Sequence, residues 1–156
     1  MPNLLVPAVI RSFHNIFTSI WVGGMLAMVL SVLPAIRKEI KDPKTQGALI
    51  TQVLVRQSRW VYLGILVLIG SGLLMTRFAG QSSGLFDFSN PYATVLSVKH
   101  ILVILMTLIA VIRSTVFRTA ATSDNKNKKK TSMAMLMVNT LIGLIILVLS
   151  SVNAIL

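Results

Sequence analysis

Two histidines, His14 and His100, are the side chains best suited to metal or redox chemistry, and both lie inside long apolar segments. A polar group in hydrocarbon is costly enough to require a reason. Counted from Pro7 and Pro91 at about 1.5 Å per residue, His14 lies about 10 Å and His100 about 14 Å along its segment. We therefore expect the two imidazoles at similar depth in the same half of a membrane.

Helical periodicity places each histidine on a mostly apolar stripe. The stripes are Pro7, Arg11, His14, Thr18, Trp21 and Met25 in the first segment, and Leu96, His100, Ile104, Thr107 and Val111 in the third. If they face each other, they form an apolar slot with one nitrogen on each wall. That is the arrangement required by a six-coordinate haem b with two axial imidazoles.

The same interpretation assigns roles to the side chains around the slot. Arg11, Lys99 and Arg77 are the expected cations for the haem propionates, and Trp21 is an expected wall residue. The alternatives are interhelical hydrogen bonding by each histidine and a copper or zinc site. Two histidines leave the coordination of such a metal incomplete unless methionines contribute. The methionines considered are Met25, Met28 and Met106.

The chain around these residues has the composition of a membrane protein. Its 156 residues are 54% hydrophobic with a mean hydropathy of +0.81, well above an ordinary soluble domain. Four apolar blocks are long enough to cross a bilayer, at about 20 residues each. We expect helices at about 6–36, 48–75, 91–117 and 133–156, with the first closing near Pro34. The predicted fold is therefore all-α, one transmembrane four-helix bundle.

The net charge of +11 follows the connections between these helices. Lysines and arginines concentrate in the first and third connections, whereas the second carries Arg77 and Asp87. By the positive-inside rule, both termini and the second connection lie on the outer side of the cell membrane. The basic connections then contact anionic lipid headgroups rather than nucleic acid, and TSDNKNKKKTS is expected to be a flexible, solvated turn. With no cysteine, thiolate metal sites are excluded.

Several short motifs resemble the copper-resistance-D superfamily, which includes relatives of the membrane-bound haem-containing protoporphyrinogen oxidases. They are HNIFTSIWVGGM in the first helix, RQSRW and LIGSGLLMT in the second, and YATVLSVKHILVILM in the third. This resemblance implies that His14 ligates haem. It also places Lys99 where the oxidase branch has its essential lysine.

This chain departs from that pattern by adding His100 directly after Lys99. The two side chains point about 100° apart, so they cannot both face one slot. Either His100 is the second axial ligand and Lys99 serves a propionate or substrate, or Lys99 is the functional group and His100 packs. The first is preferred, because neutral imidazole is the better iron ligand at neutral pH.

The functional expectation is a cytochrome b-like membrane protein that holds one haem b between the first and third helices and transfers single electrons. Four helices with little soluble mass favour lateral contact with partner membrane subunits, and a quinol is the expected type of donor. The alternatives are a protoporphyrinogen oxidase-like enzyme, in which Lys99 is essential, and a copper-transport or structural accessory subunit.

Overall fold

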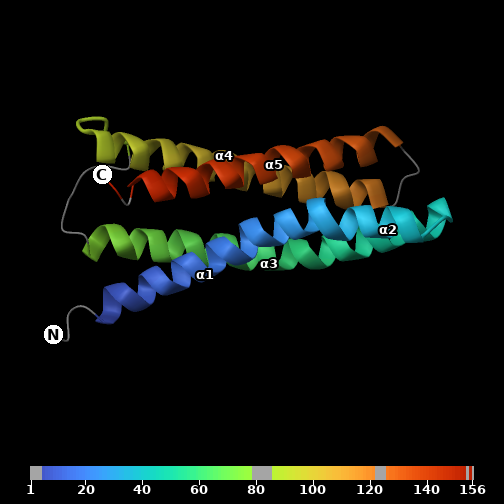
Figure 1. Ribbon diagram of the computed structural model, residues 1–156, viewed down its shortest axis with the longest axis horizontal. Helices are drawn as coiled ribbons and strands as arrows, with labels where there is room; N and C mark the ends of the chain where they lie inside the picture. Colours follow the sequence, from blue (N-terminus) through green and yellow to red (C-terminus); the bar gives the residue numbers. More distant parts are fainter. Residues whose placement is uncertain (1–4, 79–85, 122–125, 154, 156) are drawn as a thin grey trace.

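The computed structural model describes residues 5–78, 86–121, 126–153 and 155, and everything described is helix apart from short connections. The elements are α1 (Leu5–Ala27), the π-helical turn η2 (Met28–Val32), α2 (Leu33–Glu39), α3 (Pro43–Phe78), α4 (Pro91–Ala121) and α5 (Lys126–Asn153). α1, η2 and α2 follow one another without a break. The described chain therefore forms four long helical rods (Figure 1).

Each rod contains an apolar stretch long enough to cross a membrane: Leu5–Glu39, Pro43–Met75, Pro91–Thr115 and Lys130–Asn153. Inside a bilayer the backbone must satisfy its own hydrogen bonds, and a helix does so within one segment. The large apolar side chains left exposed, such as Leu30 and Leu66, suit contact with acyl chains. The protein is a multi-pass integral membrane protein, and the all-helical prediction is confirmed for the described residues.

Two helix pairs make up the bundle. α1 packs along α3 and α4 packs along α5, whereas α3–α4 and α1–α5 contacts join the two pairs more lightly. α1 and α4, which the sequence placed on opposite walls of one slot, are not among the closely packed pairs and stand diagonally across the bundle. α1 begins and α5 ends at the same end of the molecule (Figure 1).

The predicted helices are shorter than the observed ones. The first does not close near Pro34 but continues to Glu39, and the π-helical turn η2 lies directly before the proline. Because proline lacks an N–H and its ring crowds the preceding turn, the wider π turn accommodates it without ending the rod. The tract predicted as a flexible turn is also partly wrong, because α5 already begins at Lys126; residues 122–125 lie outside the described part.

Local capping explains where α3 and α4 begin. Thr45 donates to the Asp42 carboxylate from its hydroxyl and from its N–H, at 2.8 Å for the latter. These bonds lower the pKa of the Asp42 carboxyl below its ordinary value, so the anion sits at the positive end of the α3 dipole. At the start of α4, the Ala93 N–H donates to Asn90 Oδ1 at 2.8 Å. This confirms the start predicted at Asn90-Pro91.

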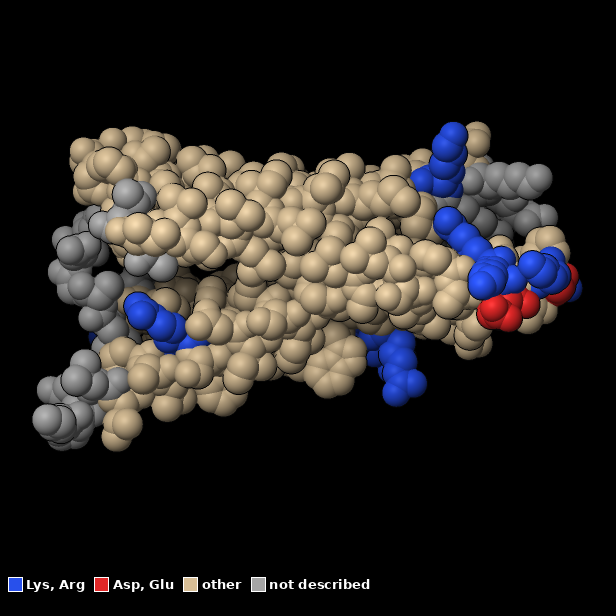
Figure 2. Space-filling model, viewed as in Figure 1, with Lys and Arg blue, Asp and Glu red and all other residues tan. Residues whose placement is uncertain are grey.

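The lysines and arginines visible in Figure 2 gather mainly at the end where α2 meets α3. Arg37, Lys38, Lys41 and Lys44 are all exposed there. The α2–α3 hairpin also extends beyond the neighbouring end of the α4–α5 pair (Figure 1). This basic end is the one predicted to face the cytoplasm.

Candidate intramembrane binding site

His14 is half-buried on α1 and is oriented by α3. Its Nδ1 lies 2.9 Å from the hydroxyl oxygen of Ser71, a buried residue of α3. The one hydroxyl proton of Ser71 goes to the Val67 carbonyl oxygen at 2.6 Å, so Ser71 accepts from His14. This pattern assigns the proton of the neutral imidazole to Nδ1 and leaves the Nε2 lone pair available. A second partner that orients the ring in this way is typical of a metal-ligating histidine.

The inward face of α4 differs from the predicted stripe. Ile104 and Val111, expected to line the slot with His100, are exposed. The face that packs inward carries Met106, Ala110 and Arg113. Hydrophobic periodicity chose the wrong stripe because, in a membrane, the lipid-facing side of a helix is as apolar as the packed side.

Lys99 continues this inward face toward the end of α4 that begins at Pro91. With Val103 and Met106 it follows the four-then-three spacing of one helix face, and its side chain is half-buried. The ammonium of Lys99 lies within electrostatic range of the His14 imidazole. Lys99 therefore shares the face that carries Met106, and it is buried to a similar degree as the adjacent His100.

His100 stands at the edge of the same face. Its imidazole is half-buried and interacts with the backbone of Leu96, one turn earlier on its own helix. Its buried Nδ1 has no partner in hydrogen-bonding geometry among the described residues. Convergence of the His14 and His100 rings on one ligand remains a prediction.

Of the other predicted site residues, two are exposed and one is buried in the core. Arg11 on α1 and Arg77 in the last turn of α3 are exposed near the end of the molecule where α1 begins. Trp21 is buried on α1, and its Nε1 has no hydrogen-bond partner among the described residues. On the face shown in Figure 2, the surface is hollowed between the two helix pairs toward the end where α1 begins. This end, which is the predicted outer end, therefore combines the His14 imidazole with the cations Arg11, Arg77 and Lys99, together named the outer site.

Asp87 is an acidic residue in the described part of the α3–α4 connection, at the end of the molecule where α1 begins. Its carboxylate accepts from the Ser89 N–H at 2.9 Å. Hydrogen bonding from Ser89 lowers the pKa of the Asp87 carboxyl, which stays ionised at neutral pH. The Asp87 backbone is held against α4 by its N–H donating to Ser97 Oγ at 2.8 Å, and its carbonyl accepts from that hydroxyl at 2.7 Å.

Deeper in the bundle, three methionines lie in one contiguous core. Met25, Met28 and Met106 are all at least 95% buried and belong to the same hydrophobic cluster. These are the three methionines that the sequence singled out as possible metal ligands. Met25 is wholly buried, and its Sδ lies 3.6 Å from Asn139 Nδ2 on α5.

Asn139 is a polar residue in the core whose importance the sequence did not reveal. It is fully buried, and its Oδ1 has no hydrogen-bond partner among the described residues. A buried, unsatisfied carbonyl oxygen is costly unless water or a ligand reaches it. Asn139 Nδ2 donates to the Met25 sulfur, so a thioether and a buried amide with an unsatisfied oxygen are neighbours in the core. The available signal was an amide in the middle of the uncharged fourth span.

Arg113 is a second polar core residue that sequence reasoning missed. Its side chain is 3% exposed, and its Nε has no partner among the described residues. The neighbouring Ser114 hydroxyl donates to the Val111 carbonyl and accepts a hydrogen bond from Tyr62 of α3. The signal for Arg113 was its position inside the third predicted span.

Comparison with known families shows to which protein family the chain belongs. A family model described as copper resistance protein D matches residues 51–153, about two thirds of the chain. The chain belongs to the copper resistance protein D family. No significant match to a curated protein or to a solved structure was found.

The copper resistance protein D match overlaps the predicted resemblance in the second and third helices but not in the first. It includes the second, third and fourth spans, with RQSRW, LIGSGLLMT and YATVLSVKHILVILM. The motif HNIFTSIWVGGM around His14 lies before Thr51 and therefore outside the matched range. Among the described residues, no three histidine or acidic side chains form a metal-ligating cluster.

Proposed function

We propose that this member of the copper resistance protein D family binds copper within the bundle, in the monovalent state, and handles it as cargo. The pair formed by Met25 and Asn139 carries the proposal. It places a thioether sulfur beside a buried amide, whose nitrogen donates to the sulfur and whose carbonyl oxygen has no partner among the described residues. Family membership supplies copper as the metal class.

The donor types favour the monovalent ion. Thioether sulfur is a soft ligand that suits Cu(I), whereas carboxylates suit harder cations. The chain has no cysteine, and its four acidic residues lie in or beside the connections between helices. Met106 lies about 22 Å along α4 from Pro91, and Met25 about 30 Å along α1 from Leu5. The buried sulfurs therefore offer soft donors through the deeper part of the bundle.

Metal analysis of the purified protein tests this proposal. We expect protein exchanged into detergent under reducing conditions to take up Cu(I) in competition with a chromogenic Cu(I) chelator. The same preparation should not retain Zn²⁺, because thioethers are poor zinc ligands. Failure to compete for Cu(I), with the protein folded by circular dichroism, would reject the proposal.

A second candidate function is electron transfer through one haem b, as a subunit of a larger membrane oxidoreductase supplied by a quinol. The observation that favours it is the outer site. His14 has an available Nε2 oriented through Ser71, and Arg11, Arg77 and Lys99 are cations toward the same end. An anionic prosthetic group fits this charge pattern better than a free metal cation does.

In that function His14 would hold the iron, and Lys99 with Arg11 and Arg77 would orient the propionates. A bound haem supplies one-electron redox chemistry. The protein itself supplies the oriented imidazole, the cations and the apolar walls, of which Trp21 is one. A protoporphyrinogen oxidase-like activity would be a specific form of this haem-dependent function, in which Lys99 contacts the substrate.

Paired variants on α4 test which residue serves this second function. We expect His14→Ala to remove any b-type signal from a reduced-minus-oxidised spectrum. Lys99→Met should lower the haem content per protein about tenfold, because Lys99 is on the inward face, whereas His100→Leu should leave the haem content nearly unchanged. Loss of the low-spin signal in His100→Leu alone would instead make His100 the second axial ligand.

A further inference from the structure

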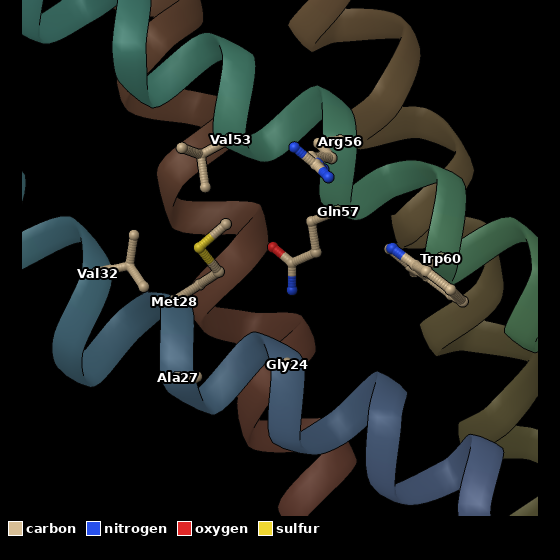
Figure 3. A pocket seen from close by; sticks show the side chains of 8 residues that line it. All are labelled: Gly24, Ala27, Met28, Val32, Val53, Arg56, Gln57 and Trp60. Carbon is tan, nitrogen blue, oxygen red and sulfur yellow. The ribbon is translucent and has the colours of Figure 1, made fainter.

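A groove between α1–η2 and α3 is separate from His14 and from the Met25–Asn139 pair, and it shares only Met28 with the methionine core. It encloses about 320 Å³ and is lined on one side by Gly24, Met28 and Val32 and on the other by Arg56, Gln57 and Trp60 (Figure 3). The lining is mainly apolar and opens on the surface of the bundle. Trp60 remains 55% exposed and Arg56 is exposed.

The groove lies at the depth of lipid headgroups. Arg56 is about 28 Å along α3 from Met75, where the apolar stretch ends. Since the hydrocarbon core is about 30 Å thick, a bilayer whose far boundary is near Met75 has its other boundary near Arg56. Trp60 is one turn deeper than Arg56, and aromatic side chains favour this interfacial layer. Along α3, Arg56 lies between Met75 and the basic end where α2 meets α3.

Gln57 brings an unsatisfied polar atom into this groove. Figure 3 shows its amide projecting from α3 toward α1, with the amide oxygen on the side of Met28. Oε1 is buried and has no hydrogen-bond partner among the described residues. Gly24 makes room for the amide, because a Cβ at that position would be 3.3 Å from Gln57 Nε2. Because Oε1 has almost no accessible surface, an occupant reaches it only when the Gln57 amide turns toward the groove, and such an occupant should supply a hydrogen-bond donor.

We propose that this groove is a specific site for an anionic glycerophospholipid with a free headgroup hydroxyl. The Arg56 guanidinium pairs with the phosphate, the hydroxyl donates to Gln57 Oε1, and an acyl chain lies against Met28 and Trp60. The charge of Arg56 selects an anion, the orphaned oxygen of Gln57 selects a donor, and the apolar lining suits an acyl chain. Basic pockets between helices at a membrane surface bind anionic headgroups by the same electrostatics.

Native mass spectrometry of the whole protein, released from nanodiscs of mixed phosphatidylcholine and phosphatidylglycerol, tests the charge selection. We expect the wild type to retain phosphatidylglycerol, and Arg56→Gln to lower the ratio of phosphatidylglycerol to phosphatidylcholine retained about tenfold. The matched control is Arg59→Gln. It removes an exposed cation three residues further along α3 that does not line the groove, and it should leave the ratio unchanged.

A second comparison tests the hydroxyl. Phosphatidylmethanol carries the same phosphate charge but no headgroup hydroxyl. The wild type should prefer phosphatidylglycerol to it, and Gln57→Leu should remove that preference while retaining anionic lipid. Gly24→Ala, which crowds Gln57, should weaken retention of both anionic lipids.

Three outcomes would overturn the proposal. Equal losses in Arg56→Gln and Arg59→Gln would indicate general attraction to a basic surface. An unchanged preference for phosphatidylglycerol over phosphatidylmethanol in Gln57→Leu would remove the role of the amide. A species of two copies that is lost in Gly24→Ala, with no lipid retained by the wild type, would assign the groove to a second copy of the chain.

Discussion

Replacing both Met25 and Met106 by leucine is expected to lower the affinity for Cu(I) on the order of a hundredfold, or about 1.4 kcal/mol for each tenfold. Both sulfurs are buried in the same core cluster, and leucine retains volume and hydrophobicity while removing the soft donor. Exchange of methionine for leucine usually costs less than about 1.5 kcal/mol of stability. The fold should therefore survive, and Cu(I) competition titration measures the loss directly.

Met137→Leu provides the matched control for this experiment. Met137 is on α5, as Asn139 is, but it is exposed on the lipid-facing surface, so its replacement should leave the Cu(I) affinity unchanged. An equal loss in the control would indicate nonspecific binding to surface thioethers. Full affinity in the double variant would show that Met25 and Met106 only fill space in the core, as methionines often do.

Gly143→Leu is expected to lower the free energy of unfolding by about 3 kcal/mol, because it overpacks the contact between α1 and α5. A Cβ at Gly143 would be 3.2 Å from both Cγ atoms of Val22 and 3.5 Å from Met25 Cε. The two helices must separate to admit a larger side chain, since close approach at small residues holds membrane helices together. Reversible unfolding in mixed micelles measures the change.

Gly70→Leu separates this packing effect from the general effect of losing a glycine. Gly70 is exposed on α3, and a Cβ there would meet nothing within 4 Å. We expect the free energy of unfolding of this variant to be at least as large as that of the wild type. The reason is that leucine is more favourable than glycine in a helix by roughly 0.8 kcal/mol. Comparable destabilisation of the two variants would contradict the tight contact at Gly143. Since Gly143 also lies beside Met25, Gly143→Leu should weaken Cu(I) binding as well.

Helix boundaries show how far local sequence rules reach in this chain. The start of α4 was predicted correctly because Asn90 and Pro91 make a local cap and first turn. The end of the first rod was predicted wrongly at Pro34, since η2 accommodates the proline and the helix continues to Glu39. The start of α5 was missed because hydropathy indicates only which residues are apolar enough for the membrane. The helix itself begins earlier and includes polar residues such as Lys130.

The sequence singled out residues of the candidate site by type, but it could not give their directions. His14 stays a predicted ligand, and its hydrogen-bond partner Ser71, 57 positions away, was not foreseen. Lys99 and His100 are adjacent, and the choice between them depends on which face of α4 turns inward. Hydropathy cannot make that choice, because Ile104 on the lipid side is as apolar as Met106 in the core.

The sequence by itself determined the four spans, the all-helical class and the basic end, because a bilayer demands long apolar helices and an asymmetric distribution of cations. Only the tertiary structure decided that α1 pairs with α3, that Met25 meets Asn139 and that Lys99 shares the face of Met106. The physical reason is that helix association in lipid depends on close packing and a few hydrogen bonds between distant residues. Neither close packing nor such hydrogen bonds produce a hydrophobic periodicity in the sequence, because the membrane-spanning helices are apolar on all sides.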